Sequence, residues 1–213
     1  MTDVYIVQKL ENNKDIIVNV PGSKSITNRA LMLAALSDGE CNLDGVLFSD
    51  DSRAFLDCLE KLGFQLFIDE NEKRVKVVGT SGKIPNRKAT IDVRSAGTAA
   101  RFLTVMLAVT GGEYTLNSSE QMKKRPMGEI IDLLRNAGVK ISCLEEEGHF
   151  PFIISSNGLD KKEVSINTDT SSQYASALLM AAVMTGLKIK LTGKRVNGAY
   201  IKITLNMLKQ FGI

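Results

Sequence analysis

Several residue types that build common kinds of sites are scarce in this chain of 213 residues. It contains no tryptophan, one histidine and three cysteines. The cysteines (Cys41, Cys58 and Cys143) are widely separated and include no Cys-x-x-Cys motif, which argues against a disulfide framework and against a zinc site. The single histidine, His149, lies in a polar turn, so a histidine-based catalytic triad is not expected. We therefore expect neither a metal nor a cofactor.

Strong net charge and long apolar runs are also missing. Lys and Arg number 27 against 24 Asp and Glu, a net charge of +3, which is too small for a general nucleic-acid binder. No apolar run approaches the roughly 20 residues that span a bilayer, so no membrane partner is expected. The first residues lack the pattern of a secretory signal, and the cytoplasm is the expected location. What remains is an apolar fraction of 44%, enough for a substantial core.

An internal repeat is the most informative pattern. Three segments (residues 30–36, 102–109 and 177–184) are apolar on nearly all sides, stop at a glycine and precede a short alternating run that predicts a strand. Three amphipathic segments (52–62, 127–137 and 201–211) stop at Gly63, Gly138 and Gly212, so both series share a period of about 75 residues. This predicts an α/β fold built from repeated βαβαββ units.

The third unit is expected to be truncated. Pairs of predicted strands end the first unit (64–68 and 74–78) and the second (139–144 and 150–154). In the third unit the chain stops at Ile213, one residue past the glycine that ends the helix. We therefore expect this chain to be a piece of a longer polypeptide.

The three apolar helices begin with polar or small residues. In the first, Gly22 allows a tight turn, Ser23 or Ser25 can cap the helix, and Lys24 and Arg29 carry positive charge. The second begins with small residues around Gly97 and has Arg101 one turn further on, and the third begins with the hydroxyl-rich run from Asp169 to Gln173. Each motif alone fits an ordinary cap, and the run Asp50-Asp51-Ser52 is read as capping the next helix.

Taken together, the helix starts predict an anion site. A helix N-terminus carries roughly half a positive charge and several unpaired N–H donors. Helix starts related by a repeat should meet at one end of the domain, where Lys24, Arg29, Arg101 and Arg125 would add cations for phosphates or carboxylates. A Walker-type phosphate loop is excluded, because its motif does not occur.

These residues resemble one enzyme family from about Pro21 to the end of the chain. The motifs are Pro21-Gly22-Ser23-Lys24-Ser25 with Asn28-Arg29, Ala96-Gly97-Thr98-Ala99 with Arg101, Arg125-Pro126-Met127, Ser171-Ser172-Gln173 and Tyr200. In this order they resemble the 5-enolpyruvylshikimate-3-phosphate (EPSP) synthases of the shikimate pathway. The resemblance implies two lobes of three βαβαββ units each, with helices inside and sheets outside. Residues 21–213 would be the N-terminal lobe, and residues 1–20 an arm that packs with the C-terminal lobe of the same parent enzyme.

The resemblance also implies roles for individual residues. The residues that would contact shikimate 3-phosphate are Lys24, Ser25, Arg29, Ser171, Ser172, Gln173, Asn197 and Tyr200. Those that would contact phosphoenolpyruvate are Lys24, Gly97, Arg101, Arg125 and Gln173. Asn197 stands where many members have a serine that donates to the substrate phosphate. Lys24, which would contact both substrates, is the catalytic residue expected in this chain.

The implied reaction transfers the enolpyruvyl group of phosphoenolpyruvate to the 5-hydroxyl of shikimate 3-phosphate. It needs a general base, an acid and cations around the departing phosphate. The acid and base would come from the C-terminal lobe, so this chain should bind without turning over. The alternatives are a non-catalytic module that binds a phosphate-bearing ligand, and the related transferase acting on UDP-N-acetylglucosamine. That relative usually relies on a loop cysteine, and none of the three cysteines lies in such a loop.

Overall fold

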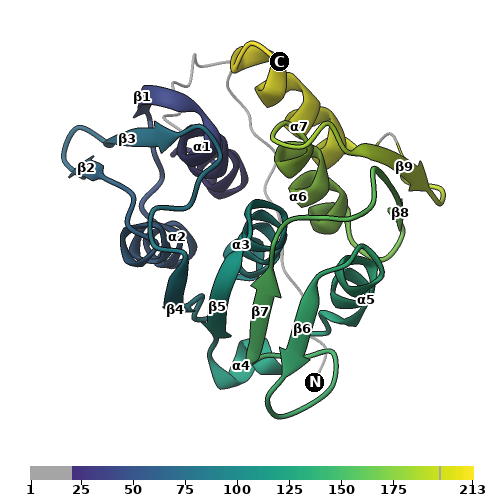
Figure 1. The fold of residues 1–213 in the computed structure, drawn as a ribbon. Helices are drawn as coiled ribbons and strands as arrows, with labels where there is room; N and C mark the ends of the chain where they lie inside the picture. The colour runs from purple at the N-terminus through teal and green to yellow at the C-terminus, as the bar shows by residue number, and fades with distance from the viewer. Residues whose placement is uncertain (1–20, 197) are drawn as a thin grey trace, which may run out of the picture.

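The computed structural model describes residues 21–196 and 198–213 (Figure 1). The predicted arm at residues 1–20 and the candidate residue Asn197 lie outside the described residues. The first unit contains α1 (Lys24–Leu36), β1 (Asp38–Asp44), α2 (Asp50–Lys61), β2 (Leu66–Asp69) and β3 (Arg74–Thr80). The second contains β4 (Lys88–Asp92), α3 (Gly97–Thr110), β5 (Gly112–Asn117), α4 (Glu120–Lys123), α5 (Gly128–Asn136), β6 (Lys140–Cys143) and β7 (Phe152–Ser156). The third contains β8 (Glu163–Asn167), α6 (Ser172–Ala182), β9 (Lys188–Thr192) and α7 (Ala199–Gln210).

The sheets of the three units follow one pattern. The second unit has four strands in the order β4-β5-β7-β6, with β4 and β5 parallel and the other pairs antiparallel. The sheet β1-β3-β2 repeats its antiparallel part, and the sheet β8-β9 repeats its parallel part. The predicted βαβαββ repeat is thus confirmed, complete in the second unit and partial in the described residues of the other two.

The inner helices α1, α3 and α6 lie at the centre of the molecule, with the sheets around them (Figure 1). Every residue of α3 except Arg101 and Thr110 is buried, as expected for a helix that is apolar on all sides. Burial of this apolar surface is the main force that holds the lobe together. The predicted arrangement, with helices inside and sheets outside, is confirmed.

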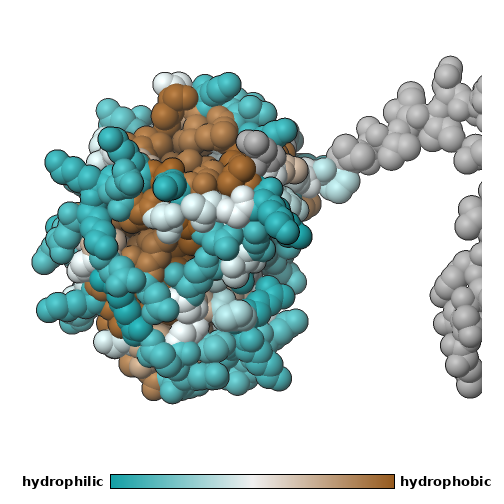
Figure 2. Space-filling model, turned by 90° about the vertical axis from the view of Figure 1, so that its right-hand side faces the viewer, coloured by the Kyte–Doolittle hydropathy of each residue, from teal (hydrophilic) through white to brown (hydrophobic). Residues whose placement is uncertain are grey.

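The third unit differs from the others at its amphipathic helix. Leu56, Ile131 and Leu205 occupy the same place, seven residues before the glycine that ends each helix. Leu56 and Ile131 are 3% and 0% exposed, whereas Leu205 is 43% exposed. Figure 2 shows apolar side chains gathered on the upper part of the face that includes α7. The third unit, whose described part has only the two strands β8 and β9, therefore also leaves the apolar side chain of Leu205 uncovered.

Candidate functional site

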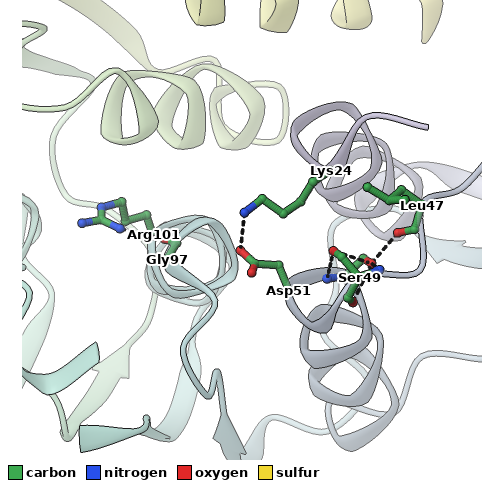
Figure 3. A network of polar contacts seen from close by, with 7 residues as sticks. Lys24, Leu47, Ser49, Asp51, Gly97 and Arg101 are labelled. Atoms are coloured by element: carbon green, nitrogen blue, oxygen red, sulfur yellow. Dashed lines mark hydrogen bonds and ion pairs between the residues drawn. The ribbon is translucent and has the colours of Figure 1, made fainter. Parts of the chain in front are cut away.

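The start of α1 is held in place by a cap and a close backbone contact. Ser23 is the N-cap, and its hydroxyl accepts a hydrogen bond from the N–H of Ile26 at 3.4 Å. A Cβ at Gly22 would collide with the carbonyl oxygen of Gly45, so only glycine fits there. This arrangement leaves Lys24, the first residue of the helix, with its Nζ 3.3 Å from Oδ2 of Asp51 (Figure 3).

The start of α2 corrects one prediction. We expected Asp50-Asp51-Ser52 to cap this helix. The N-cap is Ser49, which forms a reciprocal capping box with Ser52, whereas Asp50 and Asp51 lie in the first turn. The hydroxyl of Ser52 also donates to the carbonyl oxygen of Leu47. Because the serines satisfy the cap, the carboxylate of Asp51 is available to Lys24. The sequence pattern gave no sign of this ion pair.

The start of α3 is a small positively charged cradle formed by Gly97, Arg101 and Arg125. Nη1 of Arg101 donates to the carbonyl oxygen of Gly97 at 2.9 Å. A Cβ at Gly97 would lie 2.9 Å from Nη1 of Arg101 and 2.8 Å from Nη1 of Arg125, so the absence of a side chain lets both guanidinium groups approach the helix start. Nε of Arg101 is buried and has no hydrogen-bond partner among the described residues. This α3 cradle therefore keeps an unused donor.

Arg29 lies in the interior and is held by three hydrogen bonds. Its side chain is buried and donates from Nε to Thr204 Oγ1 at 2.8 Å, from Nη2 to Ser176 Oγ at 2.9 Å and from Nη1 to the carbonyl oxygen of Ser25 at 2.8 Å. We call these four residues the Arg29 network. Burial lowers the pKa of Arg29 to about 10, so the guanidinium remains charged at neutral pH. All three acceptors are neutral, and no carboxylate among the described residues forms an ion pair with this guanidinium.

The start of α6 borders a cavity of about 380 Å³ between this helix and α7. Ser171 is the N-cap, and its Oγ accepts from the N–H of Gln173 at 3.3 Å. The other predicted shikimate 3-phosphate residues on this lining are Ser172, Gln173 and Tyr200. The ring of Tyr200 lies 5.6 Å from the guanidinium carbon of Arg29, which links the cavity to the Arg29 network.

Tyr174 connects the α6 start to the α3 cradle. Its hydroxyl donates to the carbonyl oxygen of Pro126 at 2.9 Å, and its ring lies 5.4 Å from the guanidinium carbon of Arg101. The starts of α3 and α6 are thus joined by direct contacts, and Arg29 ties α1 to α6 one turn further in. Sequence reasoning assigned no ligand-binding role to Tyr174, Asn28 or Asp51. The signal for Asp51 was present, since its distance to the next helix-ending glycine matches that of Pro126 and Tyr200.

Two further observations concern the described part of the chain. It holds no group of three or more His, Cys, Asp or Glu residues arranged to bind a metal ion. None of its helices has the length and apolar character needed to cross a bilayer.

Comparisons with known proteins identify the family. A model of the family described as EPSP synthase (3-phosphoshikimate 1-carboxyvinyltransferase) matches residues 9–213. The 3-phosphoshikimate 1-carboxyvinyltransferase of Trichormus variabilis is 37% identical over 213 residues, which are 99% of this chain and 50% of that protein. The enzyme of the same name from Neisseria meningitidis serogroup B is 43% identical over 205 residues, which are 94% of this chain and 47% of that protein.

A solved structure agrees with the fold. The EPSP synthase from Acinetobacter baumannii matches with a TM-score of 0.78 at 24% identity, over 92% of this chain and 43% of that one. The chain spans about half the length of the curated relatives it matches. By sequence match and fold, it belongs to the EPSP synthase (3-phosphoshikimate 1-carboxyvinyltransferase) family.

Proposed function

We propose that this chain is the shikimate 3-phosphate-binding half of a 3-phosphoshikimate 1-carboxyvinyltransferase. The observation that carries the proposal is the meeting of the inner helix starts, with Lys24, the α3 cradle and the Ser171 cap at one end of the lobe. Such a concentration of N–H donors and cations suits ligands with several anionic groups. The C-terminal lobe as partner and the cytoplasm as location belong to the same proposal.

Shikimate 3-phosphate would bind in the cavity between α6 and α7. The hydroxyl oxygen of Ser171 already accepts the N–H of Gln173, which leaves its proton free to donate to a phosphate oxygen. Ser172 and Gln173 line the same cavity. Arg29, with Ser25, would hold the carboxylate and hydroxyl side of the ligand. Its positive charge, which the neutral acceptors of the network do not balance, supports this role. The buried guanidinium would stabilise a nearby carboxylate through its electric field.

Phosphoenolpyruvate would bind at the α3 cradle. Arginine forms paired hydrogen bonds to carboxylate and phosphate, and the cradle offers two guanidinium groups beside a residue without a side chain. The unpaired Nε of Arg101 supports this assignment, because a buried donor without a partner is costly until a ligand satisfies it. Lys24 would contact both substrates and stabilise charge on the departing phosphate.

Turnover would require the missing half. The transfer adds the 5-hydroxyl of shikimate 3-phosphate to phosphoenolpyruvate and then eliminates phosphate, which needs a general base and an acid that protonates the methylene carbon. In this proposal both come from the C-terminal lobe, and closure of the two lobes excludes water. The chain alone should bind shikimate 3-phosphate and show no activity.

The direct test is a calorimetric titration of shikimate 3-phosphate into the chain. We expect saturable binding that Lys24→Ala and Ser171→Ala each weaken about tenfold or more, since each loses a hydrogen bond to a charged group. Lys140→Ala and Ser155→Ala, at exposed strand positions, are the matched controls and should bind as the parent does. Binding that is equal in all four variants would contradict the proposed site.

Two additions separate the competing functions. UDP-N-acetylglucosamine should not bind, and competition between it and shikimate 3-phosphate would favour the related transferase. A separately produced C-terminal half should restore formation of enolpyruvylshikimate 3-phosphate. Binding without restored activity at saturating C-terminal half would favour a non-catalytic module.

A further inference from the structure

Asp51 forms an ion pair with Lys24, the residue that the proposed function places in contact with both substrates. Its Oδ2 is 3.3 Å from Nζ of Lys24, and the two side chains are 22% and 46% exposed. Figure 3 shows the pair beside the helix that carries Gly97 and Arg101. An anionic ligand that approaches Lys24 must therefore compete with the carboxylate of Asp51 for the lysine ammonium group.

The internal repeat also places Asp51 at the site, and this evidence does not depend on the contact with Lys24. Asp51 lies twelve residues before Gly63, the glycine that ends α2. The residues at the same distance before Gly138 and Gly212 are Pro126 and Tyr200. Pro126 follows Arg125 of the α3 cradle, and Tyr200 lines the cavity at the α6 start. The equivalent place in all three units thus faces the same end of the lobe, and in α2 it holds an acid.

The local structure does not need Asp51 as a cap. Ser49 and Ser52 form the capping box of α2. The positive end of the helix still stabilises a carboxylate in its first turn, so Asp51 can remain ionised there when Lys24 leaves it. The pair can therefore open without leaving a strongly destabilised charge.

We propose that Asp51 is the resident counter-ion of Lys24, which a ligand must displace before it engages the lysine. This inference rests on the proposed function only for the identity of that ligand. Asp51 would act as a specificity-determining residue: a small anion such as inorganic phosphate gains little beyond Lys24, and the competing carboxylate weakens its binding. A ligand that also contacts the other helix starts outcompetes Asp51.

The test is an NMR titration of inorganic phosphate into the full chain and into Asp51→Asn. We expect Asp51→Asn to bind phosphate about threefold more tightly, the size of effect typical of a partly exposed ion pair. Asp50→Asn is the matched control, because it removes the same charge from the same helix turn at an exposed position. On a Lys24→Ala background, Asp51→Asn should give no gain. Thermal unfolding of each variant checks that the fold is kept.

Several results would overturn the inference. Equal gains in Asp51→Asn and Asp50→Asn would mean that Asp51 contributes only diffuse negative charge. Weaker phosphate binding in Asp51→Asn would mean that it orients Lys24 rather than competes for the anion. No detectable phosphate binding by Asp51→Asn would also contradict it, because removal of the competitor should expose the lysine. If the threefold gain holds while the parent chain fails to bind shikimate 3-phosphate, the proposed function fails and the counter-ion role stands.

Discussion

The fifth residue of each inner helix is polar, but only the one in α6 has all its buried polar atoms hydrogen-bonded among the described residues. In α6 this residue is Ser176, whose hydroxyl accepts from Arg29 and lies 2.9 Å from Thr204 Oγ1. In α1 it is Asn28, whose amide nitrogen and oxygen are both buried without a partner among the described residues, and in α3 it is Arg101, whose Nε is in the same state. The α6 side of the site is satisfied within the lobe, whereas α1 and α3 retain unused polar groups.

The difference suggests that α1 and α3 keep polar groups for a partner outside the lobe, whereas the Arg29 network is already formed without a ligand. A buried polar atom without a partner costs about 1–3 kcal/mol, so such atoms persist where something outside the lobe completes them or where the fold tolerates the cost. The Arg29 network instead ties α1, α6 and α7 together before any ligand arrives. We expect substitutions in the Arg29 network to affect stability first, and substitutions in the α3 cradle to affect binding first.

The largest expected effect on stability is that of Arg29→Ala. It removes a fully buried side chain with three hydrogen bonds, so the free energy of unfolding should fall by about 3 kcal/mol. Arg101→Ala should cost about 1 kcal/mol or less, since this side chain is partly exposed and its hydrogen bond is within its own helix. Urea denaturation of both variants measures the difference. Equal losses would remove the contrast between the Arg29 network and the α3 cradle.

The next effect concerns Thr204, the acceptor for Nε of Arg29. Thr204→Val keeps the shape and removes the hydroxyl, which leaves a buried charged donor without its partner, and we expect a loss of about 2 kcal/mol. Thr204→Ser keeps the acceptor and is the control, with a loss of about 1 kcal/mol for the deleted methyl group. Chemical denaturation should rank the serine variant above the valine variant. The reverse order would mean that packing, and not the hydrogen bond, governs this position.

The sequence predicted the repeat and the helix series because these depend on local pattern. Glycine stops and apolar periodicity mark the helices regardless of what packs on them. The start of α3 was also predicted, at the small residues around Gly97, although Ala96 provides no side-chain cap. The signal there was the run of small residues with Arg101 one turn further on.

The side-chain partners could not be predicted, because they depend on packing between distant segments. Arg29 was expected at the ligand site, but its hydrogen bond to Thr204, 175 residues further along the chain, could not be predicted from local pattern. The Asp50-Asp51 pair carries the local signature of a cap, and only the approach of α1 to α2 brings Asp51 to Lys24. Residue type and helix position therefore identified the groups at this end of the lobe, while tertiary packing decides which of them are free.

A smaller effect of opposite sign is expected at Asn28. Asn28→Leu replaces an unpaired buried amide with an apolar side chain of similar size, so stability should rise by about 1 kcal/mol. Asn28→Asp keeps the size and adds a buried charge, and it should lower stability. Urea denaturation distinguishes the two. A loss of stability in the leucine variant would show that the amide has a partner, and the contrast between α1 and α6 would then narrow.

The last prediction tests Tyr174, the residue that joins α6 to the α3 cradle. Burial raises the pKa of Tyr174, so the folded protein keeps its phenol neutral at a pH where the unfolded chain begins to ionise. Above about pH 10 the unfolded state then binds fewer protons than the folded state, and the stability that Tyr174 contributes declines as the pH rises. Tyr174→Phe lacks this dependence and loses the hydrogen bond to Pro126, so it should be about 1 kcal/mol less stable at pH 8 and lose stability less steeply above pH 10. Parallel slopes for the two proteins between pH 9 and 11 would mean that the phenol ionises alike in both states, and that α6 and the α3 cradle meet less closely than this contact implies.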